Sequence, residues 1–171
     1  MALTRPDGAV KATREGESWQ LLEPVKAKGD RGPIEETILT VVGAKMDREI
    51  DAAPKALADF GLDAPVAEVD LTLKDGKHAT LQLGAKSPTG VWVYAKERDK
   101  PNVFVVGESV LRDATRPAAD FRDKTVLAFS RADVSGVEIV TATDTIAVEP
   151  EGAQWKITRP VARPADPDTV A

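Results

Sequence analysis

Apolar and polar positions alternate with a period of two along much of the chain, which predicts a protein built mainly of β-strands. The clearest alternation lies at 66–73, and the hairpin signal Asp75-Gly76 links it to a return strand at 78–83. An amphipathic helix is predicted at 33–43, from Ile34, Ile38, Leu39 and Val42, and a shorter helix at 54–60. Further strands are predicted at 9–13, 44–50, 91–95, 102–106, 137–140 and 145–148, and helical or turn segments at 108–112 and 118–121.

Strands therefore outnumber helices, and most successive strands are joined by hairpins. This order predicts an α+β fold, with a mainly antiparallel sheet and a few short helices packed on one side. Parallel βαβ units are not expected, because few helices lie between consecutive strands.

A repeat with a constant offset of 136 residues organises the chain. The segment around Trp155 restarts, without a gap, the pattern around Trp19: a short strand, a Gly turn, a Trp strand, Pro-Val, a polar link and Asp. Six positions are identical in the two copies, namely Glu15/Glu151, Gly16/Gly152, Trp19/Trp155, Pro24/Pro160, Val25/Val161 and Asp30/Asp166.

The repeat predicts one near-complete unit at 8–124 and the opening of a second, truncated unit at 125–171. In the second copy, Asp166 and Pro167 have the pattern of a helix N-cap followed by the first helical residue. The sequence stops at Ala171, where that helix is expected to begin, so we expect a longer protein with at least two units. The alternative is that two unrelated hairpins share a Trp and a Pro by chance.

The composition is that of a soluble globular chain and narrows the function classes. Hydrophobic residues make up 42% and charged residues 30% of the 171 residues, so a core can form. The net charge of -5 and the lack of a basic stripe argue against nucleic-acid binding. The absence of cysteine excludes disulfides, thiolate metal sites and cysteine nucleophiles. No apolar run approaches the length of a membrane-spanning helix, and the first residues lack a signal-peptide core.

An ordered set of short motifs resembles a bacterial family of unknown function, the one numbered 4340, over nearly the whole chain. The motifs are a hairpin ending in Trp and Pro, a Gly-Leu-Asp-x-Pro turn, a strand ending in Asp-Gly, a strand ending in Leu-Gly, a Val-Tyr-Ala strand and a Phe-Arg-Asp-Lys segment. They correspond here to Trp19 and Pro24, Gly61 to Pro65, Asp75 and Gly76, Leu83 and Gly84, Val93 to Ala95, and Phe121 to Lys124.

The resemblance implies an extracytoplasmic (periplasmic) repeat domain, typically held behind an N-terminal membrane helix. It also implies a setting beside ABC-type transport systems of the gliding-motility kind. It implies no established reaction and no catalytic residues. This chain departs from the family pattern because it contains no such membrane helix, so any membrane attachment needs an anchor outside the chain.

Residues with catalytic or metal-binding chemistry form no recognisable set. His78 is the sole histidine and is expected to be an exposed strand residue, since a metal site needs further ligands. None of the serines lies in a Gly-x-Ser-x-Gly elbow, and no phosphate-binding loop is present.

The charged pairs have structural explanations. The acidic pairs Glu35/Glu36 and Asp166/Asp168 are expected at helix N-termini, where negative charge is favourable. Arg122 and Asp123 are candidates for an ion pair at the junction between units. We therefore assign no catalytic, cofactor-binding or metal-binding residue and expect no cofactor.

Aromatic residues supply the single candidate contact site. Trp92 and Tyr94 share one face of a strand and are candidates for lining a groove, although packing in the core is the alternative. Trp19 and Trp155 occupy equivalent repeat positions, which favours a packing role in each unit.

The sequence thus predicts a non-enzymatic interaction domain with protein partners in a membrane-associated transport or motility assembly. A second interpretation is a module that binds a cell-envelope polymer through Trp92 and Tyr94. A third is an enzyme with an unrecognised acidic site. A surface apolar patch favours the first, a groove of exposed aromatics the second, and converging carboxylates the third.

Overall fold

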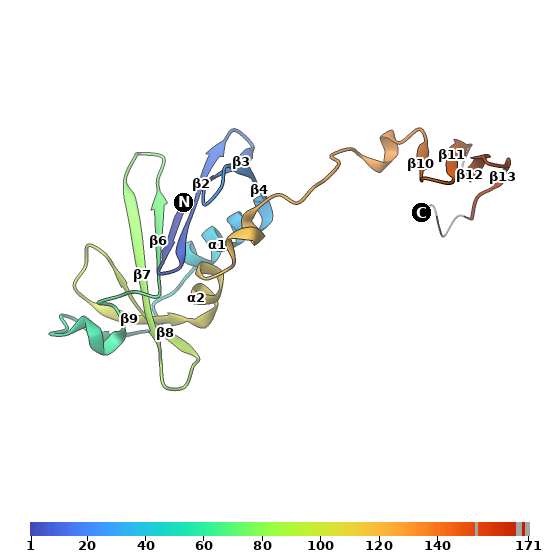
Figure 1. The fold of residues 1–171 in the computed structure, drawn as a ribbon. Helices are drawn as coiled ribbons and strands as arrows, with labels where there is room; N and C mark the ends of the chain where they lie inside the picture. The colour runs from blue at the N-terminus through green and yellow to red at the C-terminus, as the bar shows by residue number, and fades with distance from the viewer. Residues whose placement is uncertain (153, 167–168, 170–171) are drawn as a thin grey trace. The chain divides into compact units, whose positions relative to one another are not determined.

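The computed structural model describes residues 1–152, 154–166 and 169. The chain divides into two compact units, Met1–Lys124 and Thr125–Ala171, here called unit 1 and unit 2 (Figure 1). Each unit is described by itself.

Unit 1 is built on an antiparallel sheet of nine strands in the order β4-β3-β2-β1-β6-β7-β8-β9-β5. Most neighbours in the sheet are successive hairpin strands, and β1 joins two groups of strands by pairing with β2 on one side and β6 on the other. The mainly antiparallel sheet with helices confirms the α+β class. The strands are β1 (Ala2–Arg5), β2 (Gly8–Glu15), β3 (Ser18–Glu23), β4 (Ala27–Gly29), β5 (Arg48–Asp51), β6 (Ala67–Thr72), β7 (His78–Lys86), β8 (Trp92–Glu97) and β9 (Val103–Gly107).

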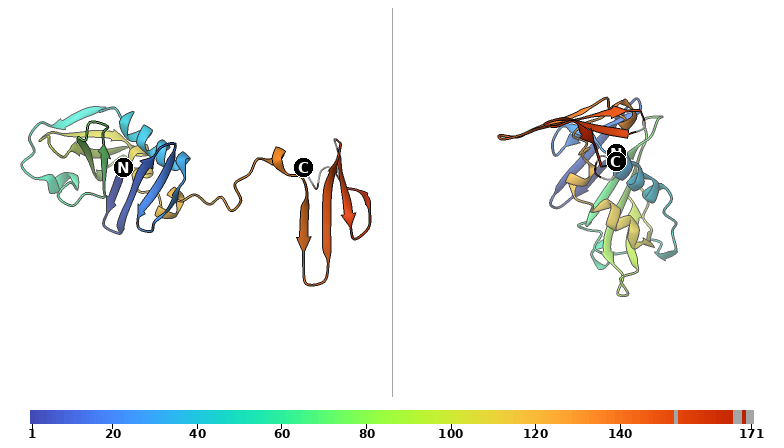
Figure 2. Two further views of the ribbon diagram at one scale, coloured as in Figure 1. Left: turned by 90° about the horizontal axis from the view of Figure 1, so that it is seen from above. Right: turned by 90° about the vertical axis from the view of Figure 1, so that its right-hand side faces the viewer.

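Two α-helices and two short 3-10 helices complete unit 1. Helix α1 (Arg31–Val42) begins at Asp30, whose carboxylate accepts a hydrogen bond from the backbone N–H of Gly32 at 3.0 Å. Helix α2 (Glu108–Ala114) contacts α1 and strands β6, β8 and β9. The 3-10 helices are η1 (Leu57–Phe60) and η2 (Ala118–Phe121). Figure 2 shows how the helices and the sheet of unit 1 are arranged.

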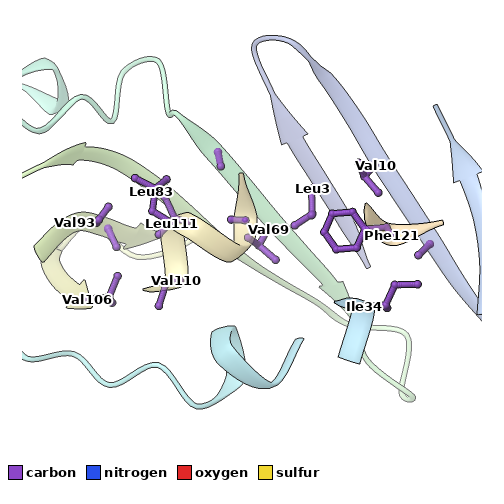
Figure 3. Packing of buried hydrophobic residues seen from close by; sticks show 14 of the residues in the cluster. Leu3, Val10, Ile34, Val69, Leu83, Val93, Val106, Val110, Leu111 and Phe121 are labelled. Carbon is purple, nitrogen blue, oxygen red and sulfur yellow. The ribbon is translucent and has the colours of Figure 1, made fainter. Parts of the chain in front are cut away.

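The core of unit 1 lies between the apolar face of the sheet and α1, α2 and η2. The ring of Phe121, fully buried, lies among the side chains of Leu3, Val10 and Ile34 (Figure 3). A second part of the same cluster contains Val69 together with residues of β7, β8, β9 and α2. Full burial of one such side chain contributes roughly 1.5–3 kcal/mol, so this cluster dominates the stability of unit 1.

Unit 2 is a four-stranded antiparallel sheet in the order β10-β11-β12-β13, preceded by the 3-10 turn η3 (Arg131–Asp133). Figure 2 shows the four strands side by side. The strands are β10 (Val137–Val140), β11 (Thr145–Glu151), β12 (Gln154–Arg159) and β13 (Arg163–Pro164).

The sheets β1–β4 and β10–β13 have the same pairing register at the offset of 136 residues. Leu3 pairs with Val10, and Ile139 pairs with Ile146. The bulge also coincides: the register shifts between Lys11 and Ala12 in β2 and between Ala147 and Val148 in β11. The turn glycines Gly16 and Gly152 have φ angles of 60° and 65°, and the peptide bonds Glu23-Pro24 and Arg159-Pro160 are both cis.

Several predicted elements are corrected by the structure. Strands β1, β4 and β13 were not predicted, the helix expected at 54–60 is reduced to η1, and the strand expected at 44–50 is β5 at Arg48–Asp51. The helix expected at 33–43 begins two residues earlier, because Asp30 provides its cap. The cap expected at Asp166-Pro167 reaches residues outside those described.

Candidate functional site

The C-terminal half of α1 carries an apolar surface that the core does not use. Leu39 and Val42 of α1 are 69% and 68% exposed, and Met46, which follows the helix, is 54% exposed; these three residues are called here the α1 surface. The predicted helix is confirmed, but Leu39 and Val42, two of the four apolar residues that predicted it, are exposed. The buried residues of α1 are Ile34 and Thr37. Monomeric proteins seldom expose several large apolar side chains together without an interaction role.

A sequence signal for the α1 surface exists in the helical period. With 3.6 residues per turn, Leu39 lies about 140° around the helix from Ile34, so the two side chains cannot share one face. The apolar residues of α1 therefore span an arc wider than the sheet and α2 can cover. The predicted helix had a single apolar face, which does not account for the exposed residues.

Two hollows flank the α1 surface, and Met46 lines both. The first is a cleft of about 360 Å³ between the end of α1 and strands β6 to β9. Its walls are apolar, from Val41, Val42, Leu71, Leu81 and Phe104 among others, and Lys100 and Asn102 also line it. The second hollow lies between the end of α1, β8 and the start of α2. The surface and its hollows form a contoured apolar site suited to side chains of a partner.

The two predicted contact residues, Trp92 and Tyr94, have different surroundings. Trp92 is half-buried and lines the second hollow together with Leu39 and Met46. Tyr94 is half-buried and packs edge-on against Phe60 of η1, with ring centroids 5.2 Å apart. Trp92 therefore adjoins the α1 surface, whereas the ring of Tyr94 is engaged in packing within unit 1.

Buried polar contacts fix α1 against α2. The carboxylate of Asp113 is 1% exposed and accepts a hydrogen bond from the Thr40 hydroxyl at 2.8 Å. Arg116 lies 3.5 Å from Asp113 and also forms a 2.9 Å ion pair with Glu36. Since an unpaired buried carboxylate is costly, these partners hold the last two turns of α1 in place. The α1 surface is thereby presented on a rigid support.

A polar pair lies on β6 and β7. His78 is exposed, as expected, and its Nδ1 lies 2.9 Å from Asp70, which also accepts a hydrogen bond from the Thr80 hydroxyl at 2.8 Å. Burial opposes ionisation of Asp70, but the hydrogen bonds from His78 and Thr80 and the nearby positive charge outweigh it and lower the pKa of this carboxyl. Thr80 donates to Asp70, so the three side chains do not form a relay ending on a nucleophile.

The remaining candidate residues take structural positions. Glu35 pairs with Arg31 at 2.9 Å within α1, and its pKa is lowered, chiefly by that hydrogen bond. Asp123 forms a 2.7 Å ion pair with Lys28 of β4. Among the described residues, no group of three or more His, Asp or Glu side chains is placed to hold a metal ion.

Comparison with known proteins gives one result. The family model described as Domain of unknown function (DUF4340) matches residues 19–171. Neither the curated proteins nor the solved structures contain a significant match. Over the described residues, no helix combines the length and the apolar character needed to cross a bilayer.

Proposed function

Because the chain belongs to the family Domain of unknown function (DUF4340), we propose that it is a non-enzymatic, extracytoplasmic interaction domain. Its partners are protein components of a membrane-associated ABC-type transport or motility assembly. The family resemblance supports the location and the setting. The α1 surface supports the mode of action.

The exposed apolar residues at the end of α1 carry the proposal. Leu39, Val42 and Met46 are each more than half exposed, and the helix that bears Leu39 and Val42 is fixed by the hydrogen bond from Thr40 to Asp113. Burial of an exposed Leu or Val side chain in an interface contributes roughly 1–2 kcal/mol. Trp92 extends the surface with the residue type most often found at the energetic centre of protein interfaces.

The second unit extends this proposal to the architecture of the protein. We propose that β10 to β13 are the opening of a second repeat unit. The support is the coincidence of strand order, register, bulge and turn glycines at one offset. A protein of this kind presents similar surfaces in series, which raises the affinity for a partner that contacts more than one unit.

The α1 surface is tested by site-specific crosslinking in cells that express the protein. A photoreactive residue replaces Leu39, and a matched control carries it at Leu73, which is 48% exposed, follows the end of β6 and lines neither hollow. We expect a crosslinked adduct with a membrane transport component at position 39 and none at position 73.

The outcomes separate the proposed function from its alternative. Equal adducts at both positions, or none at position 39, contradict a role for the α1 surface. An adduct with a polysaccharide or peptidoglycan fragment at position 39 replaces the protein partner by a cell-envelope polymer. The double variant Leu39→Glu and Val42→Glu should abolish the protein adduct of a reporter placed at Met46, with unfolding free energy changed by less than about 0.5 kcal/mol, because both side chains are exposed.

A further inference from the structure

Met46 is the member of the α1 surface whose polarity chemistry can change. The sequence contains no cysteine and two methionines. Met1 is half-buried and packs against the core of unit 1, whereas Met46 is 54% exposed. Cysteine and methionine are the side chains that two-electron oxidants convert in defined, reversible first steps. An oxidant therefore has one readily accessible sulfur atom in this chain, that of Met46.

The position of Met46 makes its polarity decisive for partner binding. Its side chain lines both the cleft beside β6 to β9 and the second hollow, which also contains Leu39 and Trp92. Ala44 lines both hollows too, but it has only a methyl group, so Met46 is the large side chain that the hollows share. A partner that fills either hollow contacts Met46. Methionine suits this role because it is flexible and polarisable.

Oxidation converts Met46 from an apolar to a polar side chain. The Sδ lone pair attacks one oxygen of a hydroperoxide, and an S–O bond forms as the O–O bond breaks. The sulfur loses two electrons, and the peroxide gains them and leaves, after a proton shift, as water or an alcohol. The product is a sulfoxide, whose oxygen accepts hydrogen bonds.

The cleft offers few partners to a sulfoxide oxygen. Three side chains with donors line it, and each already donates to a carboxylate: Thr80 to Asp70, Lys100 to Glu97 and Asn102 to Glu49. A sulfoxide buried beneath a partner therefore has to compete for these donors or remain without one. Burial of an unpaired polar group is unfavourable, so the sulfoxide weakens any interface formed over Met46.

We propose that Met46 is a reversible oxidation site that regulates the α1 surface, with a hydroperoxide as the oxidant. The thioether form binds the protein partner, and the sulfoxide form releases it. This regulation rests on the proposed function, because it acts on the same surface. Reduction of the sulfoxide by two thiols yields the thioether, water and a disulfide, and so restores binding. By reciprocity, a bound partner protects the Met46 sulfur from oxidation.

The test uses the whole chain, purified with the photoreactive residue at position 39. The chain is treated with hydrogen peroxide, the peroxide is removed, and the chain is added to membranes of the expressing cells and illuminated. Once mass spectrometry shows that Met46 is oxidised, the adduct should fall about tenfold relative to the untreated chain. Incubation of the oxidised chain with methionine sulfoxide reductases and a thiol should restore it.

Three variants separate oxidation of Met46 from other effects of peroxide. Met46→Leu keeps an apolar side chain of similar size without the sulfur, so its adduct should be the same before and after treatment. Met46→Gln places a polar group at this position and should lower the adduct without any peroxide. Leu83→Met places a thioether at a site that is 0% exposed, and this thioether should oxidise more slowly than Met46.

The outcomes distinguish this regulation from the proposed function. An adduct that persists after Met46 is oxidised overturns the regulation and leaves the α1 surface as proposed. Loss of the adduct from Met46→Leu after peroxide, or equal oxidation rates at positions 46 and 83, also overturns it. A urea midpoint lowered by oxidation contradicts it too, because the sulfoxide then acts on the fold. Absence of any adduct in the untreated chain overturns the proposed function itself.

Discussion

The sheet formed by β1 to β4 and the sheet formed by β10 to β13 have one pairing register and two levels of burial. Leu3, Val10 and Trp19 are between 0% and 9% exposed in unit 1. Their counterparts Ile139 and Ile146 are 51% and 43% exposed, and Trp155 is half-buried. The same local pattern thus yields the same strands, whether or not a core covers them.

The difference shows which interactions are local and which are not. The register comes from the turn at Gly16 or Gly152, the bulge and the alternation of apolar residues, all within one hairpin. Burial of Leu3 depends instead on Val69 and Phe121, which lie far along the sequence. Unit 2 has the first kind of interaction and lacks the second among its described residues.

The largest expected difference between the two units is the loss of unfolding free energy on truncating the equivalent residues Leu3 and Ile139. Leu3→Ala should lower the unfolding free energy of unit 1 by about 2–5 kcal/mol, because it opens a cavity in a fully buried site. Ile139→Ala should lower the stability of unit 2 by about 0.5 kcal/mol or less, since the side chain is half exposed. Urea unfolding followed by NMR signals of each unit measures both. Equal losses would show that unit 2 has a core of its own.

Replacement of the turn glycines Gly16 and Gly152 is expected to lower the stability of the two units by a smaller amount, equal in both. Gly16 and Gly152 have φ angles of 60° and 65°, and a Cβ atom at either position would meet nothing within 4 Å. Gly16→Ala and Gly152→Ala should therefore each cost about 1–2 kcal/mol, from backbone strain alone. Native-state hydrogen exchange in each hairpin measures the two losses. A clear inequality would mean that the two turns are not equivalent.

The smallest expected effect concerns Asp70 of β6, the strand that pairs with β1 in unit 1 and has no counterpart among the described residues of unit 2. The pKa of Asp70 on β6 is lowered in the folded state, so its ionised form stabilises unit 1. That contribution is fully present above the ordinary aspartate pKa of about 4 and is lost as the pH falls through the lower folded value. Asp70→Asn should cost less than about 1 kcal/mol at pH 7, and this cost should shrink as the pH falls below the ordinary aspartate pKa of about 4.

Thermal unfolding of the unmodified chain and of the Asp70→Asn variant, from pH 7 to acidic pH, measures the effect. Unit 2 is the internal control. A stability difference that grows as the pH falls would contradict the sign of the pKa shift.

Local patterns in the sequence were sufficient for the hairpins but not for strand pairing at a distance. Strands β6 and β7 were predicted because Asp75-Gly76 sits between two alternating runs. Strand β1 was not predicted because Leu3 is its one large apolar residue, so its sequence shows no alternation of apolar and polar residues. Its partner β6 lies far along the sequence, so no hairpin signal marks their pairing. Strand β4 was missed because it depends on packing: a Cβ on Gly29 would lie 2.8 Å from Ile34 and 3.1 Å from Trp19.

The candidate site was predicted in part by residue type but not by location. Trp92 was singled out as an aromatic, and it lines the hollow beside the α1 surface. The exposure of Leu39 and Val42 was not predicted, because an apolar period shows that a helix has a buried face but not how wide the covering layer is. That width is set by α2 and β6 to β9, which no window along α1 contains.

The position of Phe121 at the end of unit 1 has a consequence for synthesis on the ribosome. Strands β1 to β4 can form their hairpins as soon as they emerge from the ribosome. The side chain of Phe121, which covers their apolar face, is synthesised about ninety residues after β4. During that interval Leu3 and Val10 of the nascent sheet lack the cover that Phe121 provides in folded unit 1. A chaperone that recognises bare sheet faces is therefore expected to bind nascent chains until η2 leaves the tunnel. Ribosome profiling of chaperone-bound nascent chains would then show binding that ends once η2 has emerged.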